Sequence, residues 1–201
     1  MPELIHRDPL RADFWDERFE RQFMPWDRGG VPQDLRDFVN AASTPCSTLI
    51  PGCGHAYEAA FFLAAGWPVT AIDFSAAAVA TARALLGTDG HCVQQADFFT
   101  YQSASPLQLI YERAFFCALP PSLRSAIVAR WAALLAPGAL LAGYFFITEH
   151  GSLKGPPFAI ACTDWQALMA ADFVLLEDKA VADSITVFAG QERWQVWQRR
   201  N

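Results

Sequence analysis

Short β-rich apolar runs alternate with stretches of helical apolar spacing from Thr48 to about Phe146. The pattern predicts strands over Thr48–Pro51, Val69–Asp73, Cys92–Gln95, Leu107–Tyr111 and Leu140–Ile147. The helices expected between them cover Tyr57–Ala65, Ala76–Leu86 and Leu123–Leu135. Strands that alternate with helices form βαβ units with right-handed crossovers. The chain is therefore expected to be an α/β protein with a mostly parallel sheet.

The two ends of the chain extend this core. Near the C-terminus we expect a helix at Asp164–Ala171, followed by strands Phe173–Leu176 and Glu192–Gln198 that close the sheet. Near the N-terminus, aromatic residues at helical spacing predict a helix over Asp13–Phe23. Pro32 can open a second helix over Gln33–Asn40, because proline is tolerated in the first turn. We expect one domain over residues 1–201, with helices in 1–45 and the α/β core in 46–201.

Composition narrows the possible partners. Of 201 residues, 53% are hydrophobic and 18% charged, which is typical of a packed globular protein. The net charge of −6 would repel phosphate backbones, so nucleic acid is not expected as a partner. No apolar run is long enough for a membrane span, and the N-terminus has no signal-peptide core. The five cysteines lack metal-ligand spacing, so we expect no metal site and free thiols in a reducing cytoplasm. A monomer is the default expectation.

The segment Pro51-Gly52-Cys53-Gly54 carries the first chemical signal. It joins the first expected strand of the core to the following helix. In open α/β sheets, ligands bind beyond the carboxyl ends of the strands, where the first turn must let backbone approach the ligand. Gly52 and Gly54 suit that approach because neither carries a side chain.

Acidic residues follow the next two strands. Asp73 ends the second strand, 21 residues after Gly52, where a carboxylate can accept hydrogen bonds from both hydroxyls of a ribose. Its alternative role is to cap the helix that follows, but Ser75 is better placed for that cap. Asp97 follows the third strand and could hold the exocyclic amine of an adenine, with Phe98 against the ring. Loop aspartates are also common without a ligand.

Methyl transfer fits these residues better than hydride transfer. A dinucleotide-binding turn reads G-x-G-x-x-G, whereas this chain has Tyr57 at the third glycine position, so a pyrophosphate would lose part of its site. S-adenosylmethionine carries no phosphate and needs only a glycine turn and a carboxylate. A nicotinamide-dependent oxidoreductase remains an alternative, as does a protein that binds S-adenosylmethionine without catalysis.

Five motifs spread over nearly the whole chain resemble the thiopurine S-methyltransferase family. They are Phe14–Phe19, Pro25-Trp26-Asp27, Pro51–Gly54, Phe115–Pro120 and Gly155–Phe158. The glycine turn and the Phe-Phe-Cys-Ala stretch are most similar to the plant thiol and halide methyltransferase branch. The resemblance implies a Rossmann-like class I methyltransferase fold with a seven-stranded sheet and an N-terminal helical lid over the cofactor.

The resemblance also implies which residues bind the cofactor S-adenosyl-L-methionine. Matched by motif, these are Trp15, Phe19 and Trp26 in the lid, with Gly52, Gly54, Asp73, Asp97 and Phe98 in the core. Phe19 stands where the plant branch often has tryptophan. Arg113 matches an arginine of the thiopurine enzymes, where the plant branch has tyrosine, so it is a candidate for binding the substrate or the cofactor carboxylate.

The expected reaction places few demands on acid–base groups. The methyl group leaves a sulfonium by in-line displacement, and a soft anion or thiolate needs little help from a base. We therefore expect a small-molecule acceptor such as a thiol, thiopurine, halide, thiocyanate or selenium compound, and no dedicated base. Glu112, Glu149 and His150 are the acid–base residues considered, although loop charges are usually solvated.

Overall fold

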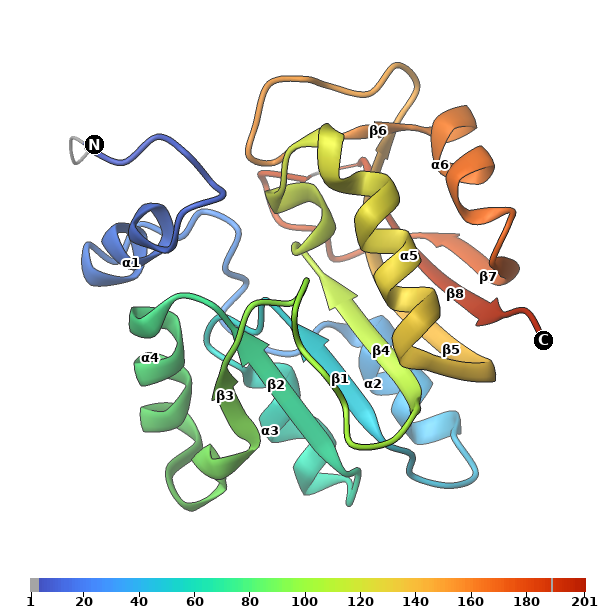
Figure 1. The fold of residues 1–201 in the computed structure, drawn as a ribbon, viewed down its shortest axis with the longest axis horizontal. Coiled ribbons are helices and arrows are strands. Elements are labelled where there is room, and N and C mark those ends of the chain that lie inside the picture. The colour runs from blue at the N-terminus through green and yellow to red at the C-terminus, as the bar shows by residue number, and fades with distance from the viewer. Residues whose placement is uncertain (1–3, 189) are drawn as a thin grey trace.

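The computed structural model, which describes residues 4–188 and 190–201, contains an eight-stranded, mostly parallel sheet (Figure 1). Seven of its strands follow the order β3-β2-β1-β4-β5-β8-β7, and the eighth pairs with β5 off this path. These seven strands are β1 (Thr48–Pro51), β2 (Val69–Asp73), β3 (Val93–Gln95), β4 (Leu107–Arg113), β5 (Leu135–Thr148), β7 (Phe173–Ala180) and β8 (Glu192–Arg199). Strand β8 runs antiparallel to both neighbours. The expected α/β fold with a mostly parallel sheet is confirmed, and the sheet has one short strand more than the seven expected.

Helices cover both faces of the sheet. They are α1 (Ala12–Glu20), α2 (Gln33–Ala41), α3 (Tyr57–Ala64), α4 (Ala76–Leu86), α5 (Arg124–Leu134) and α6 (Cys162–Met169). Short 3₁₀ turns occupy Gly87–Cys92, Phe116–Ala118 and Pro121–Leu123. Figure 1 shows α5 in front of the sheet, with α2 and α3 behind it.

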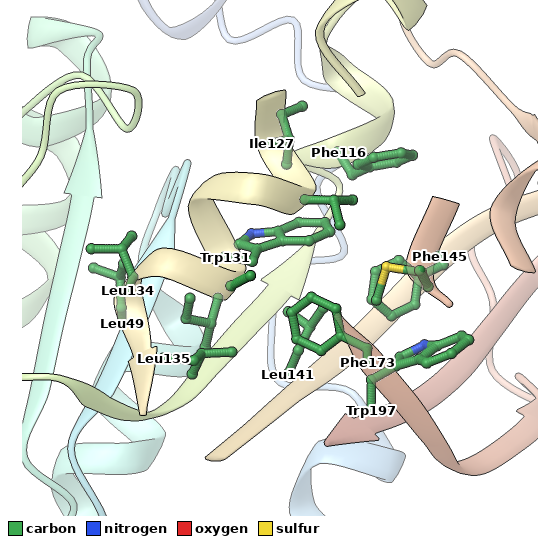
Figure 2. Close-up of a cluster of buried hydrophobic side chains, with 14 of the residues drawn as sticks. Leu49, Phe116, Ile127, Trp131, Leu134, Leu135, Leu141, Phe145, Phe173 and Trp197 are labelled. Carbon is green, nitrogen blue, oxygen red and sulfur yellow. The ribbon is translucent and has the colours of Figure 1, made fainter. Parts of the chain in front are cut away.

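The sheet separates two hydrophobic clusters. Successive residues of a strand point to opposite faces, so Leu49 belongs to one cluster and Ile50 to the other. On the first face, Trp131 of α5 and Trp197 of β8 pack with Leu49 in the cluster drawn in Figure 2. On the second face, Phe62 of α3 is fully buried with Ile50. Burial on both faces explains why the central strands are almost uniformly apolar.

Several element boundaries differ from the sequence prediction. Strand β5 begins at Leu135, not Leu140, because Leu135 already pairs with Leu107 ahead of an irregularity at Pro137-Gly138. Strand β7 continues to Ala180, beyond the predicted end at Leu176, because its polar second half still pairs with β8. A short strand, β6 (Ile160–Ala161), pairs with the end of β5 and was not predicted.

Smaller corrections concern the helices. Helix α1 ends at Glu20, not Phe23, because Gln22 has a φ of 52° that cannot continue a helix. Helix α6 begins at Cys162, two residues before the predicted start. Ser75 caps α4 as predicted, since its hydroxyl accepts the Ala78 N–H at 3.1 Å.

All five cysteines are free in the structure. Within the described ranges, no helix has the length and apolar character needed to cross a membrane. The first three residues of the N-terminal segment lie outside the described part of the chain.

Candidate active site

A cavity of about 280 Å³ lies beyond the carboxyl ends of β1 to β4 and beneath the N-terminal segment. It is formed by residues that follow or end four adjacent strands, as expected for a ligand site in an α/β sheet. Every predicted cofactor residue lies on its wall: Trp15, Phe19, Trp26, Gly52, Gly54, Asp73, Asp97, Phe98 and Arg113. The structure therefore brings together residues that are far apart in the sequence.

The turn after β1 requires its glycines. Gly52 has a φ of 59° and Gly54 a φ of 52°, in the left-handed region that side chains disfavour. A Cβ added at Gly52 would lie only 2.7 Å from Cδ2 of Phe115. Ala56 also has a positive φ, 60°, just before α3 begins. A non-glycine residue in this conformation is a strained position of the kind found at functional sites.

Asp73 is buried at the end of β2 with its carboxylate held in place. Its Oδ2 accepts the Gly54 N–H at 3.2 Å, and its Oδ1 accepts the Ser75 N–H at 3.0 Å. Burial raises the pKa of Asp73 to about 6, and these two amides oppose the shift. Each oxygen keeps a lone pair that can accept a further hydrogen bond.

Asp97 and Phe98 occupy the end of the cavity beyond β3. Asp97 is exposed and its Oδ1 accepts the Phe99 N–H at 2.9 Å, which fixes the carboxylate. Phe98 is buried and its ring packs edge-on against Phe115, with centroids 5.0 Å apart. This end of the cavity offers an aromatic wall beside a hydrogen-bond acceptor, the features expected for a purine site.

The N-terminal segment covers the cavity with aromatic rings. Trp15 of α1 packs edge-on against Trp26, with centroids 5.4 Å apart. Helix α1 is attached to α4 by Asp16, whose Oδ1 accepts the Ser75 hydroxyl at 2.6 Å and the Ala77 N–H at 3.0 Å. The following loop is tied to the segment after β7 by Arg28 and Asp183, at 2.6 Å. These contacts hold the N-terminal segment, the expected lid, over the cavity.

Arg113 at the end of β4 is paired with a residue that the sequence analysis did not select. Its guanidinium lies 3.3 Å from Glu58 of α3. Burial raises the pKa of Glu58, and the charge of Arg113 opposes that shift. The Tyr111 hydroxyl on the same wall is buried and has no hydrogen-bond partner in the described residues. A ligand in the cavity can supply the missing partner.

His55 and Asp27, neither of which the sequence analysis selected, join the lid loop to the glycine turn. His55, directly after Gly54, has its Nδ1 3.0 Å from Oδ2 of Asp27 in the lid loop. Its ring stacks on Tyr57 and lies against Phe19. Only a histidine next to the turn signalled this group in the sequence, since Asp27 is brought near it by the fold.

The three acid–base candidates from the sequence lie off the cavity wall. Glu112 is buried, and its Oε1 accepts the N–H groups of Phe115 and Phe116 at 2.9 and 2.8 Å. Glu149 and His150 are exposed neighbours that lie 3.8 Å apart. Glu112 therefore shapes the loop after β4 and does not face the cavity.

Two loop motifs noted in the sequence contact each other behind this site. Phe158 donates its N–H to the Cys117 carbonyl at 2.6 Å, and Arg124 donates to the carbonyls of Phe158 and Ala159. The Gly155–Phe158 segment thus supports the 3₁₀ turn that follows β4.

Comparisons with known proteins identify relatives of this chain. The family model described as Thiopurine S-methyltransferase matches residues 10–200. Thiocyanate methyltransferase 1 of Arabidopsis thaliana is 26% identical over 194 residues, covering 93% of this chain and 85% of the relative. Thiopurine S-methyltransferase of Pseudomonas syringae pv. syringae is 25% identical over 186 residues, covering 82% of this chain and 83% of the relative.

The fold has close structural counterparts. The Burkholderia thailandensis 1,6-didemethyltoxoflavin-N1-methyltransferase, solved with S-adenosylhomocysteine, superposes with a TM-score of 0.77 at 16% identity and covers 100% of this chain and 94% of its own. Magnesium protoporphyrin IX methyltransferase from Synechocystis PCC 6803, solved with bound SAM, gives 0.72 at 13% identity, with both chains fully covered. These likenesses show a class I methyltransferase fold.

Proposed function

This chain belongs to the thiopurine S-methyltransferase family, and from that premise we propose which residues bind its cofactor and which acceptors it methylates. It is an S-adenosylmethionine-dependent methyltransferase acting on a soft nucleophile. The acceptor we propose is a small thiol, thiopurine, halide, thiocyanate or selenium compound. The observation that supports this proposal most is the single cavity on which the glycine turn, Asp73 and the lid aromatics meet.

The residues on the cavity wall fit the cofactor. Asp73 would accept hydrogen bonds from the ribose hydroxyls, and Asp97 with Phe98 would hold the adenine. The absence of a Cβ at Gly52 lets the Phe115 ring pack against the turn on the cavity wall. The unpartnered Tyr111 hydroxyl can donate to an anionic group near Arg113. S-adenosylmethionine supplies the activated methyl group when bound.

The lid aromatics would perform two tasks. Trp15, Phe19 and Trp26 exclude water from the cavity, which strengthens electrostatic interactions inside it and aligns the acceptor. Tryptophan faces also attract cations, and a sulfonium is one. The protein thus contributes alignment and a dry environment to a displacement that needs little covalent chemistry from its side chains. We infer that the enzyme works in the cytoplasm, which its free cysteines favour, and that it is a monomer.

Calorimetric titration with S-adenosylhomocysteine, run beside NADH, tests the cofactor. We expect the wild type to bind S-adenosylhomocysteine and not NADH. This binding should be lost in Asp73→Ala and kept in Asp89→Ala, because the Asp89 carboxylate lies off the cavity wall. Incubation with labelled S-adenosylmethionine and iodide, thiocyanate, hydrosulfide, thiols or selenite then tests the acceptor class. Binding without transfer to any of them would favour the catalytically silent alternative, and binding of NADH would favour an oxidoreductase.

A further inference from the structure

His55 is presented to the cavity by an unusual piece of backbone. It stands between Gly54, with a φ of 52°, and Ala56, with a φ of 60°. Alanine in the left-handed region is disfavoured, so the surrounding structure must hold it there. The consequence is that the imidazole lies on the cavity wall, between the rings of Phe19 and Tyr57.

Asp27 fixes the protonation pattern of this imidazole. The carboxylate oxygen lies 3.0 Å from Nδ1, and its negative charge favours a proton on Nδ1 over a lone pair there in the neutral ring. The lone pair is then on Nε2, which has no hydrogen-bond partner within residues 4–188 and 190–201. A histidine oriented by a carboxylate, with its other nitrogen free, is the arrangement used for general-base catalysis.

The order of the strands places His55 at the reacting end of the site. Asp97 and Phe98 follow β3, and Asp73 ends β2, so adenine and ribose are assigned to that side. His55 follows β1, the next strand, and the wall continues to Arg113 at the end of β4. The imidazole therefore lies between the residues assigned to the ribose and Arg113, the candidate for the cofactor carboxylate, and the sulfonium of the cofactor would lie between these two ends.

The other ionisable groups on this wall are less suited to take a proton. Glu58 of α3 is paired with Arg113 of β4, and Asp73 of β2 holds two backbone amides. Burial raises the pKa of Tyr57, and burial raises the pKa of the Cys53 thiol still further. Asp97, on the far side beyond β3, is exposed and is assigned to the adenine.

We propose that His55 is the general base for acceptors that carry a thiol proton, with Asp27 as its positioning residue. The inference rests on the proposed function. The acceptor S–H bond breaks as its proton passes to Nε2, and the sulfur lone pair forms the new bond to the methyl carbon. The bond from that carbon to the sulfonium sulfur breaks, and its electron pair stays on that sulfur. The imidazolium then releases its proton to solvent.

The pair also makes the base dependent on the lid. Asp27 belongs to the loop between α1 and α2, whereas His55 belongs to the turn after β1. The orienting contact exists only while the lid covers the cavity. Proton removal is thereby confined to the closed state, in which a thiolate is shielded from water.

His55→Asn is the decisive variant, because an asparagine amide can still donate to Asp27 but has no group equivalent to Nε2. A thiol of pKa about 8.5 is only about 3% ionised at pH 7, so we expect kcat with an alkyl thiol to fall about 30-fold. The loss should shrink as pH rises toward about 9.5, where solvent ionises the thiol. Iodide and thiocyanate carry no proton, so their kcat should stay within about twofold.

Two further measurements separate the base role from a structural one. His91→Asn, which changes an exposed histidine outside the cavity wall, should leave both acceptor classes unaffected. In the complex with S-adenosylhomocysteine, an aryl thiol with distinct thiolate absorbance should bind ionised to the wild type and largely protonated to His55→Asn, at a pH about one unit below the pKa of the thiol. This second readout requires no turnover.

Three outcomes would overturn the inference. An equal loss with iodide and with thiols would mean that His55 only supports the lid. An unchanged thiol rate would mean that another group takes the proton. Equal thiolate absorbance in the wild-type and His55→Asn complexes would also mean that another group takes the proton. If the wild type fails to bind S-adenosylhomocysteine at all, the proposed function itself is wrong, which the calorimetric titration detects independently of any acceptor.

Discussion

Replacing Asp73 by asparagine should weaken cofactor binding and remove its pH dependence. The asparagine amide group would face the Gly54 and Ser75 N–H donors, and it could no longer give ribose hydroxyls a charged acceptor. Hydrogen bonds to charged groups contribute about 1.5–3 kcal/mol each. A loss of about 2–4 kcal/mol corresponds to binding of S-adenosylhomocysteine weaker by about 30- to 700-fold.

The pH dependence follows from the pKa of Asp73, which burial raises to about 6. The ligand needs the ionised carboxylate, so wild-type affinity should be level above about pH 7 and fall by up to about tenfold per unit below pH 6. Asp73→Asn has nothing to titrate at this position and should give a flat profile over the same range. Isothermal titration of both proteins from about pH 5 to 8 measures this difference.

Asp73→Asn also controls for titration of the ligand and of other protein groups, because any change of affinity with pH that remains in this variant belongs to those groups. A wild-type affinity that stays level down to pH 5 would refute the reasoning. So would an equal slope in the two proteins. Either result would mean that Asp73 does not hold the ribose through its charge.

Three other changes test the framework of the site. Gly52→Ala adds a Cβ that lies 2.7 Å from a phenylalanine ring, whereas the Cβ added by Gly66→Ala meets nothing within 4 Å. Both positions have a positive φ, 59° and 79°, so the backbone strain is similar. Thermal scans should therefore show a larger drop in melting temperature for Gly52→Ala than for Gly66→Ala. Asp16→Ala removes the hydrogen bonds that join α1 to α4, and should speed hydrogen exchange in α1 and weaken nucleoside binding by about 10- to 100-fold, whereas Asp13→Ala on the same helix should not. Burial raises the pKa of Glu112 to about 8 from its ordinary 4.5. As the pH rises from 4.5 to about 8, the unfolded chain therefore releases this proton while the folded protein keeps it, and the free energy of unfolding falls over this range. Glu112→Gln should show a smaller fall in urea denaturation between about pH 5 and 8, and an equal fall would contradict the assignment.

The sequence predicted best what depends on short-range pattern. The bounds of β1, β2 and α4 match their predictions residue for residue, because apolar runs are closed by a glycine turn or by the Ser75 cap. The irregularity at Pro137-Gly138 was missed because a proline-glycine pair is typical of a loop, whereas here the strand resumes pairing on both sides of it. The polar half of β7 was missed because an edge strand need not be apolar.

The nine candidate cofactor residues could be selected because each ends or follows a strand, or lies in an N-terminal motif, at a position that the resemblance marks. The pairs that complete the site could not. Arg113 and Glu58 lie 55 residues apart and meet only across the carboxyl ends of the sheet. No local pattern links Asp27 to His55, because their contact depends on how the lid folds back over the turn.

If His55 is the base and Asp73 holds the ribose as proposed, these long-range contacts give the lid a part in the chemistry as well as in binding. Asp16 in α1 accepts from the Ser75 hydroxyl, and the Ser75 N–H donates to Asp73, so the closed lid is joined through one residue to the carboxylate assigned to the ribose. In the same way, Asp27 joins the lid loop to His55. Opening the lid would release both contacts together, which means that a ligand held by Asp73 favours the state in which His55 is oriented. Cofactor binding and proton removal would therefore be coupled through the lid, and Asp16→Ala should lower the rate with thiols even at saturating S-adenosylmethionine, while the rate with iodide changes less.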